Sequence, residues 1–186
     1  DENPKSVHDW CVANGLPTFV CDVRHPRDVP LMLRELGQAV NRSEAAEVHA
    51  RAIEAMLRRA PDTNGRTALP LIWHRPLMAA NGTTYAGNML ACLGFNVPNI
   101  EPDGTGYPEV SPEIILQHGV TDVFLSSEPH EFTNEEGESL SEAFGNLTAT
   151  PPRIHFIDGE DLTWMGSRTA EALQRLGERL NRVHLE

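Results

Sequence analysis

Three short apolar runs, each followed by a polar loop and then by a helical pattern, constrain the fold of this chain most strongly. The runs cover residues 69–73, 121–125 and 153–157, and the helical patterns cover residues 84–93, 138–144 and 169–183. Strands that alternate with helices pair in parallel through right-handed crossovers. The sequence therefore predicts a complete small α/β lobe over residues 66–186, with a further short helix at 112–117 that Ser111 caps.

The clearest single helix is expected over residues 43–60, before that lobe. Its apolar residues recur at alternating steps of four and three, and Glu47 precedes Arg51 by four positions, which is the favourable order. Pro61 then ends the pattern. A helix of this length forms a rod of roughly 25 Å.

The N-terminal part, residues 1–42, contains too few strands for a sheet of its own. The pattern predicts a helix at 6–13, a buried strand at 16–21 and a second helix at 28–39. Because a lone strand cannot form a sheet, it must join the other lobe, pair with another chain, or belong to a lobe whose earlier strands are absent. We favour the last option. The predicted fold class is α/β, with two lobes of parallel sheet bridged by the helix at 43–60 and an incomplete N-terminal lobe.

The charge balance excludes several kinds of partner. The 186 residues include 15 Lys and Arg against 27 Asp and Glu, a formal net charge of −12. Nucleic acids and anionic membranes both attract basic surfaces, so neither is expected as a partner. No apolar run approaches the roughly 20 residues that cross a bilayer, so a membrane-spanning helix is not expected either.

Candidate ligand-binding residues follow the predicted strands, because ligands of open parallel sheets bind at the carboxyl ends of the strands. They combine aromatic, cationic, imidazole and hydroxyl groups, which suits a large ligand with flat apolar faces and polar arms. With Tyr107, from the long connection, the candidates are Trp73, His74, Arg75, Tyr107, Ser126, Ser127, Glu128, His130, Trp164, Ser167 and Arg168.

Each candidate also has a simpler structural interpretation. The tryptophans suit rim packing, the serines suit turn capping, the arginines suit pairing with nearby acids, and the histidines suit exposed loops. No catalytic motif is present, so no enzyme is expected. Two alternatives stay open: an α/β enzyme with Glu128 or Asp158 as base beside His130, and an interaction module that another chain completes by strand addition.

Several motifs, in order, resemble the helical-backbone metal-receptor family, the type III periplasmic-binding-protein-like receptors for cobalamin, siderophores and haem. The similar segments are residues 71–76, 107–111, 122–129 and 158–168. The resemblance implies that two lobes hold a metal chelate between them for an ABC-type permease. It also implies a periplasmic location, with a cytoplasmic stand-alone binder as the alternative that three scattered cysteines leave open.

On this resemblance the chelate is cobalamin-like, haem or a ferric siderophore, and no resident cofactor is required. Trp73, Trp164 and Tyr107 would bury flat ligand surface, while Arg75 and Arg168 would meet negative arms. Ser126 and Ser127 would donate hydrogen bonds, and His74 or His130 would ligate the metal axially. The family's first lobe has several strands before the segment that resembles residues 1–13; these are missing here, so a homo-oligomer through the incomplete lobe is also expected.

Overall fold

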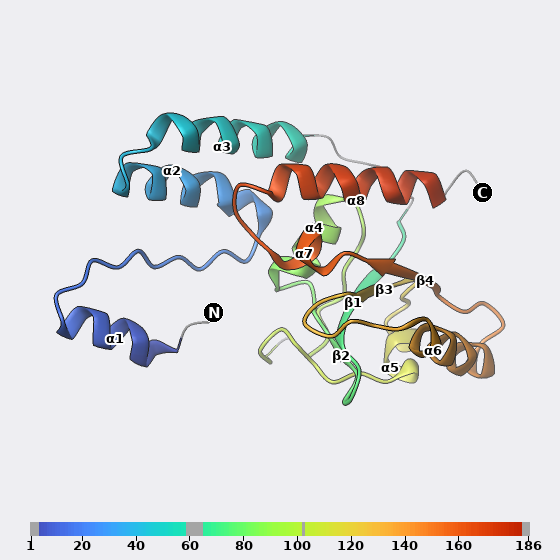
Figure 1. The fold of residues 1–186 in the computed structure, drawn as a ribbon. Helices are drawn as coiled ribbons and strands as arrows, with labels where there is room; N and C mark the ends of the chain where they lie inside the picture. Colours follow the sequence, from blue (N-terminus) through green and yellow to red (C-terminus); the bar gives the residue numbers. More distant parts are fainter. Residues whose placement is uncertain (1–3, 59–64, 102, 184–186) are drawn as a thin grey trace.

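The computed structural model describes residues 4–58, 65–101 and 103–183, the side chains of 181–183 excepted, and has an α/β fold (Figure 1). The strands are β1 (Ala68–Trp73), β2 (Met78–Ala79), β3 (Asp122–Ser126) and β4 (Arg153–Ile157). The helices are α1 (Lys5–Ala13), α2 (Val29–Ala39), α3 (Ser43–Leu57), α4 (Tyr85–Cys92), α5 (Pro112–Gln117), α6 (Asn134–Leu147), α7 (Gly159–Thr163) and α8 (Thr169–Val183), with a 3₁₀ turn η1 (Pro26–Asp28). None of the described helices has the length and apolar character needed to cross a membrane.

The four strands form one sheet in the order β2-β1-β3-β4. β1, β3 and β4 are parallel, as predicted, with Leu71 opposite Leu125 and Leu125 opposite Phe156. The prediction of a purely parallel sheet is wrong at one edge, where β2 turns back antiparallel to β1. A strand of two residues is too short to produce a periodic pattern, so the sequence did not reveal it.

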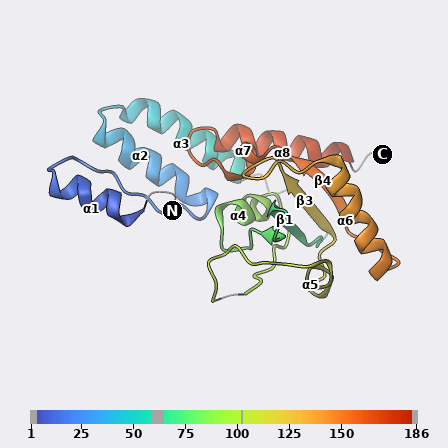
Figure 2. The same cartoon turned by 60° about the horizontal axis from the view of Figure 1, so that its bottom comes forward.

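Helices cover both faces of this sheet (Figure 2). Leu69, Leu71, Val123 and Leu125 belong to a core that includes residues of α5 and α6. Neighbouring positions such as Phe124 belong to a second core, with residues of α4, α7 and α8. Burial on both faces explains why β1 and β3 appear in the sequence as continuous apolar runs rather than as alternating patterns.

α2 and α3 form a helical hairpin that extends beyond the sheet, and α3 contacts α8 (Figure 1). Arg34 of α2 bonds Glu47 over 2.6 Å and Glu54 over 2.7 Å, both on α3. The two helices pack tightly at Gly37, where an added Cβ would lie 2.4 Å from the Cβ of Ala46. The predicted helix at 43–60 is confirmed as far as Leu57, while Ala60 and Pro61 lie outside the described residues.

The predicted buried strand at residues 16–21 is wrong. This segment is extended coil, every one of its residues is exposed, and it pairs with none of the described strands. Val20 is 71% exposed, and Trp10 of the preceding helix α1 is 60% exposed. Its apolar composition favours a strand, but a strand forms only where a neighbouring backbone supplies hydrogen bonds. Figure 1 shows α1 and this segment standing apart from the sheet.

Candidate functional site

The carboxyl ends of β1, β3 and β4 lie at one edge of the sheet, which we call the carboxyl edge. Two backbone hydrogen bonds join the loop after β3 to the ends of the two neighbouring strands. The amide of His130 donates to the carbonyl of Ile72 over 3.3 Å, and the amide of Ser127 donates to that of Ile157 over 3.1 Å. The loop after β3 is therefore held against the carboxyl ends of β1 and β4, where the topology predicts that all three loops begin.

Trp164 is fixed at this edge by two contacts, although its side chain stays 52% exposed. Its indole N–H donates to Oε2 of Glu128 over 2.8 Å. The guanidinium of Arg168 lies over the indole ring, 5.4 Å from its centroid. A half-exposed aromatic ring with a fixed orientation can stack on a flat ligand with little loss of side-chain entropy.

Arg168 is already paired with carboxylates. Its guanidinium lies 2.5 Å from Oε2 of Glu160 and 3.1 Å from Oδ1 of Asp161, which also bonds Arg175. The hydrogen bond from Arg175 and the charge of both arginines hold the pKa of Asp161 below its usual value. Arg168 thus helps to position Trp164. An anionic arm of a ligand would have to compete with Glu160 and Asp161 for the guanidinium of Arg168.

The two predicted serines hold loops together. Ser126 is fully buried, and its hydroxyl donates to the carbonyl of Glu128 over 2.6 Å. The hydroxyl of Ser127 accepts from the amide of Gly159 over 2.9 Å, which joins the loop after β3 to the start of α7. Ser127, Arg75 and Ser167 are exposed, so they can reach a ligand, whereas Ser126 lies behind the surface.

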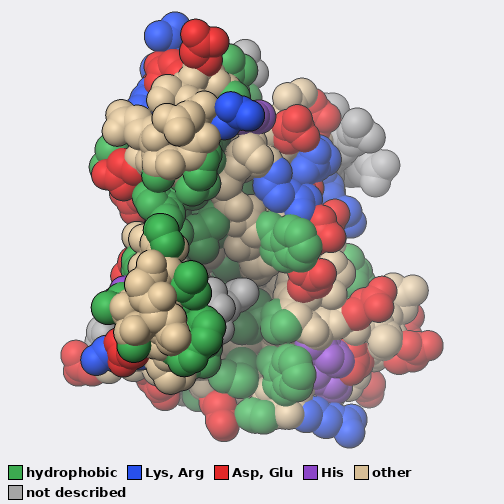
Figure 3. All heavy atoms as spheres, turned by 60° about the vertical axis from the view of Figure 1, so that its left-hand side comes forward, with side chains coloured by type: hydrophobic (Ala, Val, Ile, Leu, Met, Phe, Trp, Pro, Cys, Tyr) green, Lys and Arg blue, Asp and Glu red, His purple; other side chains and the backbone are tan. Residues whose placement is uncertain are grey.

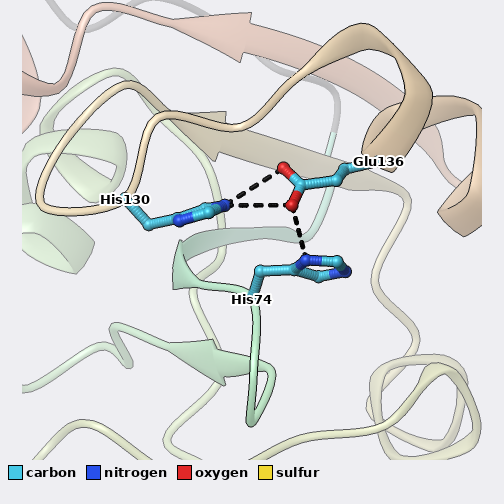
Figure 4. Close-up of side chains that lie close together, drawn as sticks. All are labelled: His74, His130 and Glu136. Carbon is cyan, nitrogen blue, oxygen red and sulfur yellow. Dashed lines mark hydrogen bonds and ion pairs between the residues drawn. The ribbon is translucent and has the colours of Figure 1, made fainter.

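His74, His130 and Glu136 form a compact group that we call the histidine–glutamate centre (Figure 4). Nδ1 of His74 lies 2.6 Å from Oε1 of Glu136, and Nε2 of His130 lies 3.0 Å from Oε2. The three side chains are 20–29% exposed. Among residues 4–58, 65–101 and 103–183, this is the one group of three or more potential metal ligands whose ligand atoms lie within 4.8 Å of one another.

Aromatic packing holds the two imidazoles in place. The ring of His130 packs edge-on against Phe132, with centroids 4.9 Å apart, and lies 5.8 Å from the ring of Trp73. The His74 ring lies 6.0 Å from Phe132, which is buried. The histidine–glutamate centre is therefore continuous with the exposed ring of Trp73 at the carboxyl edge.

Glu136 belongs to the centre because of how α6 begins. Thr133 and Glu136 form a capping box: Thr133 Oγ1 accepts from the Glu136 amide, and Glu136 Oε2 accepts from the Thr133 amide over 2.9 Å. The backbone hydrogen bond from Thr133, the hydrogen bond from His130 and the electrostatic interaction with both imidazoles lower the pKa of Glu136. A carboxylate only accepts hydrogen bonds, so Nε2 of His130 is the donor in its bond to Glu136.

Sequence reasoning missed Glu136 and Phe132. The helix was predicted to begin at Glu138, but it begins at Asn134, which brings Glu136 into the first turn. The pattern Thr133-x-x-Glu136 is a helix-start signature and could have revealed the correct beginning.

The segment before η1 is held to α4 and comes near Tyr107. The side chain of Asn88 on α4 donates to the carbonyl of Arg24 over 2.9 Å. The guanidinium of Arg24 donates a hydrogen bond to Asp22, and this bond raises the pKa of Arg24. Arg24 also has a weaker electrostatic interaction with Tyr107. Figure 3 shows a hollowed face of the molecule, with hydrophobic and histidine side chains near the hollow. Tyr107 is 41% exposed.

No family model and no curated protein sequence matches this chain. Solved structures do match its fold. The heme-binding protein HutB of Vibrio cholerae is 18% identical with a TM-score of 0.72, over 96% of this chain and 73% of that one. The heme-binding protein RhuT of Roseiflexus is 21% identical with a TM-score of 0.68, over 94% and 70%. The vitamin B12-binding protein BtuF of V. cholerae is 13% identical with a TM-score of 0.67, over 99% and 72%.

At these identities the likeness establishes the fold. The chain has the α/β fold of type III periplasmic binding proteins and spans 70–73% of the length of these three. The predicted fold class is therefore confirmed. All three are described as periplasmic binding proteins, and none is described as an enzyme.

Proposed function

We propose that this protein binds a metal chelate with flat apolar faces, of haem, cobalamin or ferric-siderophore type, and delivers it to an ABC-type permease. One observation supports this most: the loops after three parallel strands present Trp73, Trp164 and the two histidines at one edge. The fold is that of proteins described as binding heme or vitamin B12. We also propose a periplasmic or otherwise extracytoplasmic location, in keeping with those proteins; they lend no support to the cytoplasmic alternative.

The roles of the edge residues follow from their contacts. Trp73, Trp164 and Tyr107, which are 41–52% exposed, would cover the apolar faces of the chelate. Ser127 and the exposed Arg75 would contact its polar arms, and Arg168 would act by orienting Trp164. His74 or His130 would ligate the metal axially if its bond to Glu136 opens.

The enzyme alternative is disfavoured because each proposed catalytic group already has another partner. Glu128 accepts from Trp164, and His130 bonds Glu136. Asp158 accepts from the amide of Glu160 over 3.0 Å and caps α7. A general base needs a substrate proton within hydrogen-bond reach, and these geometries hold the bases in structural bonds.

The interaction-module alternative has one observation in its favour, the exposed apolar segment at residues 16–21. Such a segment can add to the open edge of a sheet in another copy of the chain. Light scattering decides this: a monomer at all concentrations would rule out self-association, and a concentration-dependent dimer would support it.

Calorimetric and absorbance titrations with haem, cyanocobalamin and a ferric siderophore test the chelate proposal. The expected result is saturable 1:1 binding of one ligand class, with a shifted absorption band wherever an imidazole enters the coordination sphere. A His118→Gln variant should bind the ligand as the unaltered chain does, because His118 is exposed and lies at the end of α5, outside the site. No heat and no spectral change with any of the three ligands would refute the proposal.

A further inference from the structure

We infer that His74, His130 and Glu136 bind a divalent first-row transition-metal ion directly, without a chelate. Two imidazole nitrogens and one carboxylate oxygen are a ligand set typical of zinc sites that keep a further position open. The ligands come from three separate segments: the end of β1, the loop after β3 and the first turn of α6. The inference concerns the free ion and does not depend on the chelate proposal.

The spacing of the three ligand atoms is close to what such an ion requires. The nitrogen–oxygen distances are 2.6–3.2 Å, and all three ligand atoms lie within 4.8 Å of one another. Around a tetrahedral ion with bonds of about 2.0–2.1 Å, neighbouring ligand atoms lie roughly 3.3–3.4 Å apart. Movements of roughly 1–1.5 Å and a change of imidazole tautomer would therefore admit the ion.

The surroundings hold the ligands in the orientation that binding needs. The amide of Thr133 donates to Oε2 of Glu136 and leaves Oε1, the oxygen nearest His74, for the ion. Phe132 packs against both imidazole rings. Hydrogen-bonded second-shell groups of this kind orient metal ligands and raise affinity. With 20–29% of each side chain exposed, an ion and a water molecule can reach the centre from solvent.

A purely structural role is the competing explanation. Glu136 caps α6, and the two histidines would then simply satisfy its remaining lone pairs. The two explanations differ in what happens when metal is added: a structural centre leaves Co²⁺ in its aqueous octahedral form, whereas a binding centre converts it to a four-coordinate form with intense visible absorption.

The test is a titration of the full chain with Co²⁺, in buffer without any chelate, followed by displacement with Zn²⁺. We expect intense visible bands with a 1:1 end point that Zn²⁺ abolishes. His74→Gln, His130→Gln and Glu136→Gln should each weaken binding at least about 100-fold, since outer-shell partners alone are worth 10–100-fold. Exposed residues provide the matched controls His118→Gln and Glu138→Gln, which should bind as the unaltered chain does.

Two results would overturn the inference: no change in the Co²⁺ spectrum, or binding that survives all three substitutions. Gln at position 136 preserves the capping box, so circular dichroism should show α6 intact. If a variant does not fold, imidazole NMR of the unaltered chain decides the question. Zn²⁺ should shift the signals of two of the eight histidines, and shifts confined to other histidines, or none, would contradict the site. Haem or cobalamin titrations are separate, so either proposal can fail alone.

Discussion

Trp164 donates its indole N–H to Oε2 of Glu128 across 36 positions of sequence, over 2.8 Å. The bond joins the loop after β3 to the residue that follows α7, and Arg168 lies over the same ring. The orientation of the most exposed aromatic side chain at the carboxyl edge therefore depends on the carboxylate of Glu128 and the guanidinium of Arg168.

Glu128→Ala should release the indole of Trp164. We expect chelate affinity to fall about 5–10-fold, on the order of 1 kcal/mol, because a charge-assisted hydrogen bond at a partly exposed site no longer orients the ring. Absorbance titration with the ligand that binds the unaltered chain measures the change. Glu131→Ala, an exposed substitution in the same loop, is the control. Equal affinity in both variants would show that the bond does not organise the site.

Asp122→Asn should destabilise the fold at neutral pH by about 3–5 kcal/mol. Asp122 is fully buried at the start of β3, where Arg66 and His155 both bond its carboxylate. The substitution removes the carboxylate but leaves the buried charge of Arg66, and breaking a buried ion pair in this way costs more stability than replacing both partners. Urea unfolding at pH 7 measures the loss, and Asp103→Asn, at an exposed position, should change stability by less than about 0.5 kcal/mol. A cost below about 1 kcal/mol for Asp122→Asn would contradict this account.

The difference in stability between the unaltered chain and Asp122→Asn should depend on pH. Burial alone would raise the pKa of Asp122, but hydrogen bonds from His155, Arg66 and Thr121 outweigh it and hold the pKa well below the ordinary value of 3.8. The folded state therefore binds this proton less readily than the unfolded state does. The carboxylate's contribution is complete well above pH 3.8 and declines as the pH falls below about 4. The stability gap between the unaltered chain and Asp122→Asn should thus narrow at pH 3, and a constant gap from pH 7 to 3 would contradict this.

Gly159→Ala should disturb the carboxyl edge although it adds one methyl group. An added Cβ would lie 2.5 Å from the Glu128 amide nitrogen and 2.7 Å from Ser126 Oγ, so the two loops must separate. We expect a loss of about 1–3 kcal/mol together with weaker ligand binding. Gly145→Ala is the matched control, because position 145 is exposed on α6 and no atom lies near an added Cβ. This substitution should raise the free energy of unfolding by about 0.5–1 kcal/mol. Thermal unfolding of both variants measures the difference, and a neutral Gly159→Ala would show that the loops are not tightly packed.

The three free cysteines should differ in reactivity. Cys21 is exposed within the coil at 16–21, whereas burial raises the pKa of the Cys92 thiol on α4. Because the thiolate is the reactive form, Cys21 should react first with a disulfide reagent and Cys92 much later. Mass spectrometry of the timed reaction identifies the order. Early labelling of Cys92, or a protected Cys21, would mean that residues 16–21 are covered in solution.

The sequence predicted the parallel strands because β1 and β3 are buried on both faces and so form continuous apolar runs. It predicted the carboxyl edge because strand direction alone determines where the loops meet. It failed at residues 16–21, since apolar composition does not show whether a pairing strand exists. It also missed Glu136, whose place beside His74 depends on a tertiary arrangement of three segments. The pairing of Arg168 with Glu160 and Asp161 agrees with the simpler interpretation of this arginine as a partner of nearby acids.

The most direct test of the central claim, that the carboxyl edge binds a flat chelate, is a haem and cobalamin titration of three proteins. These are the unaltered chain, a Trp73→Ala/Trp164→Ala double variant, and a Trp10→Ala control on the exposed α1. The account predicts saturable binding that the control preserves and the double variant weakens by at least about 30-fold, as expected for two aromatic contacts of about 1 kcal/mol or more each. Binding that depends on Trp10, or that is unchanged when both edge tryptophans are absent, would contradict it.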